Sequence, residues 1–137
     1  NELRDVICFD GPLTLPRRDM RKWDVFMREY GGLPPLLGGM RYLTMRANKI
    51  GGVLSKEFKT IEVYTRATAK ILGFYNEDRV IMQKELIKMG LEGDLIRRNL
   101  TKDEVDAVIA AITGYLHIQG KTREVGDEEG RIIIPKV

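Results

Sequence analysis

The chain is poor in the residues that build several common kinds of site. Its 137 residues include one cysteine, Cys8, and one histidine, His117. A disulfide framework needs cysteine pairs and a zinc cluster needs about four Cys or His ligands, so the sequence favours neither. No apolar run approaches the roughly 20 residues that cross a bilayer, and no signal peptide is recognisable. We therefore expect a cytoplasmic protein without a membrane association.

The composition predicts one ordinary domain spanning residues 1–137. Hydrophobic residues make up 43% of the chain, which is enough for a single core, and charged residues make up 31%. The formal net charge is +3. This mild basic excess permits nucleic-acid binding but does not require it.

Strand and helix patterns alternate along the chain, which predicts an α/β fold with helices packed on a sheet. Strands are predicted over residues 6–9 and 60–64, and the runs 122–125 and 131–134 are predicted to form a hairpin or an edge-strand pair. Helices are predicted over residues 19–30, 40–58, 66–72, 77–89 and 101–115 or beyond. The segment 31–39, GGLPPLLGG, is predicted to be an apolar loop.

Three helices carry signals of how they begin or pack. Thr101 and Glu104 form a capping-box pattern, and Asn76 is the predicted N-cap of the helix before it. The paired glycines Gly51 and Gly52 predict close packing or a kink in the helix over 40–58. The buried face of that helix is predicted to consist of Met40, Leu43, Ala47, Ile50, Leu54 and Phe58.

Acidic residues stand at places where chemistry could use them. Asp10 ends the first strand, Glu62 lies within the second, and Asp103 and Asp106 share a face at the start of the last long helix. Glu62 is either a routine exposed residue or a buried charge that needs a partner or a metal. Asp103 has a simple structural role as well, because an acid in the first turn complements the helix dipole.

A stripe of small residues follows Asp106 at helical spacing. Ala107, Ala110, Ala111 and Gly114 would let the helix lie close to a sheet and bring Asp106 near the strand ends. Carboxylates that arrive from strand ends and a helix start are suitable ligands for Mg²⁺ or Mn²⁺. Two such ions can activate water and stabilise the leaving oxygen of a phosphodiester. The spacing alone is not specific for such a site.

Five segments, in order, resemble motifs of domain-of-unknown-function family 429, whose members are described as predicted nucleases with a ribonuclease H-like fold. They are FDGPLTLP at 9–16, RKWD at 21–24 with Arg28 and Gly31, IEVY at 61–64, DEVDA at 103–107, and the ending VGD, EG and IP within 125–135. The resemblance covers nearly the whole chain.

The resemblance implies a three-layer ribonuclease H-like domain with metal-dependent phosphodiester chemistry. It implies Asp10, Glu62 and Asp106 as catalytic residues that also bind Mg²⁺ or Mn²⁺, with Asp103 as a fourth metal ligand. Nucleic-acid phosphates would contact basic residues such as Arg17, Arg18, Arg21 and Arg46.

Two departures from the family pattern bear on this reading. Thr65 stands where the family has proline, which is expected to alter only the loop. Members also have an earlier strand that carries another aspartate, followed by a β-hairpin, and the printed sequence begins after that region. It is either a fragment, a divergent short member or a member that lost the region. Without those strands we expect a smaller sheet and a metal site that is one ligand short.

Two functions remain in competition. The first is a Mg²⁺- or Mn²⁺-dependent nuclease, a hydrolase acting on phosphodiester bonds. The second is a non-catalytic binding or assembly module on the same scaffold, in which the 31–39 loop or an incomplete sheet edge forms a homodimer. A nucleotide-cofactor enzyme is disfavoured, because no glycine-rich phosphate loop stands between a strand and a helix.

Overall fold

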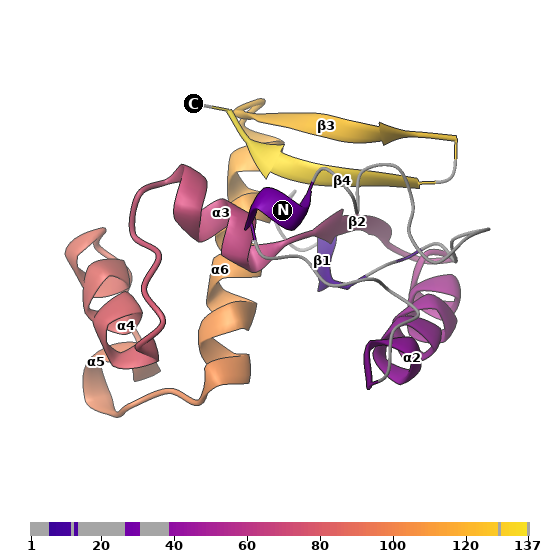
Figure 1. Cartoon of the computed structure of the whole chain (residues 1–137). Coiled ribbons are helices and arrows are strands. Elements are labelled where there is room, and N and C mark those ends of the chain that lie inside the picture. Colours follow the sequence, from indigo (N-terminus) through magenta and orange to yellow (C-terminus); the bar gives the residue numbers. More distant parts are fainter. Residues whose placement is uncertain (1–5, 12, 14–26, 31–38, 129, 137) are drawn as a thin grey trace.

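The computed structural model describes residues 6–11, 13, 27–30, 39–128 and 130–136. Within these ranges the fold is mixed α/β, with a four-stranded sheet and five α-helices (Figure 1). The elements in chain order are β1 (Val6–Asp10), the 3-10 helix η2 (Met27–Tyr30), α2 (Gly39–Leu54), β2 (Lys59–Val63), α3 (Thr65–Ile71), α4 (Arg79–Lys88), α5 (Asp94–Arg97), α6 (Lys102–Ile118), β3 (Thr122–Asp127) and β4 (Gly130–Pro135).

The strand order in the sheet is β1-β2-β4-β3. β1, β2 and β4 are parallel, while β3 and β4 form an antiparallel hairpin, one of the two arrangements expected from the sequence. Asp10, the last residue of β1, is in register with Val63, the last residue of β2. The carboxyl ends of these two strands therefore meet at one edge of the sheet, where ligands bind in many open α/β folds.

Helical segments lie against both faces of the sheet. On one face, strand residues pack with Ala110 of α6; these residues are Val6, Cys8, Ile61, Val63 and Ile133. On the other face, Ile132 and Ile134 of β4 pack with Ala67 of α3, and Tyr30 of η2 packs against the same cluster. The alternation along each strand thus assigns Asp10, two residues beyond Cys8, to the face covered by α6.

A second core lies among the helices α3 to α6, on the left of Figure 1. Its buried members are Ala69, Phe74, Met82, Leu86, Leu95, Leu100, Val105 and Ile109. Gln83 is buried beside them, and its amide is fully used: Nε2 donates to the carbonyls of Leu95 and Arg98, and Oε1 accepts from the Leu100 amide. A buried amide bonded in this way fixes the connection between α5 and α6.

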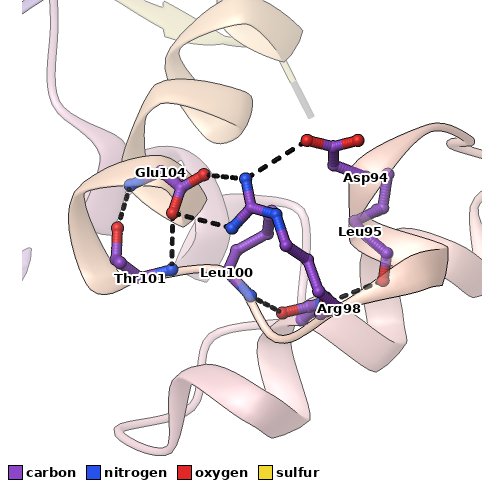
Figure 2. Close-up of polar contacts among 7 residues, drawn as sticks. Asp94, Leu95, Arg98, Leu100, Thr101 and Glu104 are labelled. Atoms are coloured by element: carbon purple, nitrogen blue, oxygen red, sulfur yellow. Dashed lines mark hydrogen bonds and ion pairs between the residues drawn. The ribbon is translucent and has the colours of Figure 1, made fainter.

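The start of α6 is held by a polar cluster shown in Figure 2. Thr101 and Glu104 form the capping box that the sequence predicts. The Arg98 guanidinium contacts Glu104 at 2.5 Å and Asp94 at 3.2 Å. The bonds that Glu104 accepts from Arg98 and from the Thr101 amide lower its pKa to about 2. α6 therefore begins at a fixed place, which matters because it carries Asp106.

The predicted strands and the described helices are largely confirmed, with two corrections in the helical region. α4 begins at Arg79 and is capped by Asp78, not Asn76. The Asn76 side chain instead accepts a hydrogen bond from the Asp78 amide, so it forms the turn that precedes the cap. The short helix α5 has no counterpart in the predicted elements.

The predicted buried face of α2 is wrong at Leu43 and Ile50, which are exposed, and holds in part at Ala47 and Leu54, which are half-buried. Phe58 lies beyond the end of the helix. The helix packs through Thr44 and Gly51, which are buried, while Leu43 and Ile50 are 47% and 43% exposed. A Cβ at Gly51 would lie 2.6 Å from Cδ2 of Leu13, so close packing is confirmed for Gly51, whereas a Cβ at Gly52 would meet nothing within 4 Å. Small and polar residues occupy the buried side of α2 because the loop after β1 approaches it too closely for large side chains.

Other predictions fall outside the described residues. Only residues 27–30 of the helix expected over 19–30 are described, and the 31–39 loop is described only at Gly39, where α2 starts. The α/β class is confirmed. The ribonuclease H-like assignment stays a prediction.

Candidate carboxylate site

Asp10 and Asp106 come together around the hydroxyl group of Thr65. Thr65 Oγ1 lies 3.1 Å from Oδ2 of Asp10 and 3.5 Å from Oδ1 of Asp106, and the Thr65 amide lies 3.3 Å from Oδ1 of Asp10. The three residues come from the end of β1, the first turn of α3 and the second turn of α6. Two carboxylates that are far apart in sequence thus share one hydroxyl group.

The close approach of α6 to β1 explains this meeting. Gly114 of α6 lies directly against the Cys8 thiol, so that a Cβ at this glycine would collide with Sγ. Ala110 packs on the same face of the sheet. The predicted small-residue stripe is therefore confirmed for Ala110 and Gly114, whereas Ala107 and Ala111 are exposed. With α6 this close, Asp106 reaches the strand ends as expected.

The electrostatics of the pair favour a shared positive charge or proton. Desolvation raises the pKa of Asp10, although bonds from Thr65 and the charge of Lys102 oppose the rise. Desolvation also raises the pKa of Asp106, followed by repulsion from Asp10, and Lys102 again acts against it. The Thr65 hydroxyl has one proton and can donate to only one carboxylate at a time. A cation or a proton at the other contact would complete the site.

Solvent can still reach the pair. Asp10 is an exposed residue and Asp106 is half-buried, while Thr65 is buried at 4% exposure. Protein atoms crowd the Asp10 carboxyl enough to raise its pKa, yet the residue keeps a surface open to water. Thr65 therefore forms the buried floor of the site, and the two carboxylates form the part that solvent can reach.

Glu62 belongs to a different environment. It is one residue before the end of β2, so its side chain is on the sheet face opposite Asp10. It is 4% exposed, and its carboxylate accepts a hydrogen bond from the Leu13 amide at 3.0 Å. The Leu13 carbonyl in turn accepts from Asn48 of α2 at 2.6 Å. Glu62 thus anchors the loop that follows Asp10, and the reading of Glu62 as an exposed residue is wrong.

The remaining predicted residues are spread over the molecule. Asp103 is exposed in the first turn of α6 and adds a repulsion that raises the pKa of Asp106. Arg46 is exposed on α2. Arg17, Arg18 and Arg21 lie outside the described residues.

A divalent ion could be held by the pair with help from water. Within the described ranges, no three side chains among His, Cys, Asp and Glu gather closely enough to hold a metal ion. Mg²⁺, however, commonly binds one or two carboxylates and takes its other ligands from water and substrate phosphates. The donor set of Asp10 and Asp106 fits that mode, with Glu62 acting on the loop behind it.

Two residues of the site were missed at the sequence level. In the sequence Thr65 stands out only as a departure from a family motif, whereas in the structure its hydroxyl contacts both acids. One signal was available in the sequence: Thr65 directly follows the strand predicted over residues 60–64, and Asp10 ends the first predicted strand. Lys102 gave no signal of its own, because its role depends on where α6 begins relative to β1.

Neither a protein-family model, nor a curated protein, nor a solved structure matches this chain. The resemblance to family 429 therefore rests on the five sequence segments and stays a prediction. Among the described helices, none is long and apolar enough to cross a membrane.

Proposed function

We propose that this protein is a Mg²⁺- or Mn²⁺-dependent nuclease whose reactive centre is the pair Asp10 and Asp106. The observation that carries the proposal is the contact of both carboxylates with the Thr65 hydroxyl at the carboxyl ends of β1 and β2. Desolvation raises the pKa of both acids, and repulsion from Asp10 adds to the rise at Asp106. A divalent cation between them would remove the repulsion.

Each residue of the site has a distinct part in this proposal. Asp10 and Asp106 would bind the ion, which when bound supplies charge stabilisation for the phosphodiester. Thr65 orients Asp10 through its amide and hydroxyl groups. Lys102 lies within electrostatic reach of both acids and is placed to attract a phosphate. Glu62 holds the loop after Asp10, so it is a positioning residue.

The direct test is hydrolysis of labelled single-stranded, duplex and hybrid nucleic acids with Mn²⁺ or Mg²⁺. Asp106→Asn and Asp10→Asn should each lower the rate by roughly 100-fold or more, as expected when one group that stabilises transition-state charge is lost. Glu92→Gln is the matched control, because Glu92 is an exposed carboxylate between α4 and α5. Equal rates for wild type and Asp106→Asn would exclude the proposal.

Thr65 gives a second test of the same centre. Thr65→Val removes the shared hydroxyl and should weaken Mn²⁺ binding by about 10- to 100-fold, the usual effect of losing a group that orients a metal ligand. Thr65→Ser keeps the hydroxyl and should retain most of the affinity. Isothermal titration calorimetry with Mn²⁺ measures both, independently of any substrate.

A second candidate function is a non-catalytic assembly module, and the position of β1 favours it. β1 is an end strand of the sheet as described, and its residues Val6 to Phe9 carry no charge. Such an edge can pair with another chain. Multi-angle light scattering after gel filtration tests this: a homodimer that is lost on Ile7→Lys would support assembly, and a strict monomer would exclude it.

A further inference from the structure

Helix α2 carries basic residues over its first three turns and no acidic residue. Its sequence, GMRYLTMRANKIGGVL, contains Arg41, Arg46 and Lys49. The chain as a whole has 23 basic and 20 acidic residues, so α2 concentrates charge that is nearly balanced elsewhere. A surface of this kind is complementary to an anion.

The exposed side of α2 mixes cations with apolar side chains. Tyr42, Arg46, Lys49 and Val53 follow one another at spacings of four, three and four residues, so they form one stripe along the helix. Tyr42 is 81% exposed and Val53 is 62% exposed, and Arg46 and Lys49 are exposed too. We call these four residues the α2 stripe. It lies opposite the buried Thr44 and Gly51.

The α2 helix lies next to the proposed reactive centre. A Cβ at Gly11, the residue after Asp10, would lie 3.6 Å from Cβ of Ala47. The Leu13 carbonyl binds Asn48, which ties the same loop to the helix. α6, which carries Asp106, packs on β1, whereas α2 contacts β2. The α2 stripe lies on the opposite side of the helix from these contacts, so a strand bound there would lie about one helix diameter, roughly 10 Å, from the loop after Asp10.

The mixed character of the α2 stripe distinguishes between two kinds of anion. A helix that inserts into a lipid surface separates an apolar face from a charged face. In the α2 stripe, an aromatic ring, two cations and a valine share one face. Single-stranded nucleic acid fits this arrangement, because its phosphates bind cations while its bases stack on aromatic rings.

We propose that the α2 stripe binds one single strand of nucleic acid. The inference rests on the proposed nuclease function and names its substrate class. Arg46 and Lys49 contact successive phosphates, and Tyr42 stacks on a base. Tyr42 and Lys49 are seven residues apart, which is about 10 Å along a helix axis. That is the length of about three nucleotides at roughly 3.4 Å each.

Binding is measured by fluorescence anisotropy with a labelled oligothymidine strand in EDTA, so that no cleavage occurs. Each phosphate contact on a single strand contributes about 0.7 to the slope of log K against log salt. Arg46→Gln combined with Lys49→Gln should therefore lower that slope by about 1.4. Tyr42→Ala should weaken binding about 5-fold or more, and Tyr42→Phe should restore it.

Arg79→Gln combined with Lys84→Gln is the matched control. Both residues are exposed on α4, at the opposite end of the view in Figure 1, and the change in net charge is the same. This control should leave the salt slope close to that of wild type. Equal losses in the two double variants would overturn the inference, since only net charge would then be at work.

Three further outcomes would also overturn it: no binding of the strand, a duplex of equal length bound as tightly, or capture of the protein by anionic vesicles but not by the strand. The proposed function fails separately. Binding through α2 without hydrolysis in Mn²⁺ or Mg²⁺ excludes the nuclease but supports the strand-binding surface. Hydrolysis that is unaffected by the α2 variants leaves the nuclease and overturns the surface.

Discussion

The helices α3 to α6 and the pair formed by β1 and α2 differ in how they are packed. In the first region Leu86 and Ile109 are almost completely buried, and every polar atom of the buried Gln83 amide is bonded. In the second region β1 is half-buried, and α2 exposes Tyr42 at 81%. The first region has the features of a scaffold, whereas the second leaves charged and aromatic groups open to a ligand.

Helix α6 connects the two regions. Val105 and Ile109 lie in the helical core, while Ala110 and Gly114 contact the sheet. Around the helix axis, Asp106 lies between the residues that face the helical core and those that face the sheet. A reactive group gains precision when it is mounted on a rigid element rather than a loop. The difference between the regions therefore indicates that stability is concentrated on one side of the carboxylate pair and ligand access on the other.

The largest expected effect compares the same substitution in both regions. Leu86→Ala removes a side chain with 0% exposure from the helical core and should lower the free energy of unfolding by about 2–5 kcal/mol. Leu43→Ala, on α2, removes a side chain that is 47% exposed and should cost less than about 1 kcal/mol. Urea unfolding followed by circular dichroism measures both. Similar losses would mean that the two regions are equally important for stability.

The sequence predicted the helical region better than the region of β1 and α2. The capping box at Thr101 and Glu104 is a local signal, and it placed the start of α6 correctly. α2 has no such signal, because its buried face is set by the loop at Leu13, whose approach favours Gly51 over large side chains. Apolar spacing alone therefore selected Leu43 and Ile50, which prove to be exposed.

The candidate site was also predictable only in part, because some of its residues have local sequence signals and others do not. Asp10 follows a clear strand, and the small residues Ala110 and Gly114 indicated that α6 lies close to the sheet. The position of Glu62 was harder to predict. A side chain near a strand end can join Asp10 in a site only if both side chains lie on the same face of the sheet. Asp10 and Glu62 are on opposite faces, and this depends on the register between β1 and β2. Register is a long-range property that neither segment encodes alone.

A second prediction tests the contact through which α6 joins β1. Gly114→Ala places a methyl group against the Cys8 thiol and should cost about 1–3 kcal/mol of stability. In a Cys8→Ala background the obstruction is gone. The same substitution should then be neutral or stabilise by up to about 1 kcal/mol, since alanine is the better helix former. Equal costs in both backgrounds, measured by urea unfolding, would contradict the close packing described for this pair.

A third prediction concerns the cost of the carboxylate pair. The pKa of Asp106 is raised in the folded state, so its contribution to stability is fully present below the unfolded pKa, near 3.8, and is lost as pH rises through the folded pKa. Asp106→Asn removes the charge and should raise the urea midpoint at pH 7. The gain should shrink as pH falls toward 4. Glu92→Gln, which removes an exposed charge elsewhere, should show no such trend. A lower midpoint for Asp106→Asn at pH 7 would show that the pair stabilises the fold.

The smallest expected effect has the opposite sign and lies in the helical region. Bonds from Arg98 and from the Thr101 amide lower the pKa of Glu104 from 4.5 to about 2. The stability that this carboxylate contributes is therefore present above about pH 4.5 and is lost as pH falls through about 2. Glu104→Gln should flatten the decline in urea midpoint over that window. The change should be modest, because the Arg98 and Glu104 side chains are 49% and 38% exposed. Parallel curves for wild type and variant would mean that the ion pair in Figure 2 contributes nothing measurable. Opposite pH trends in the urea midpoints of Glu104→Gln and Asp106→Asn would show that Glu104 stabilises the fold and that Asp106 destabilises it.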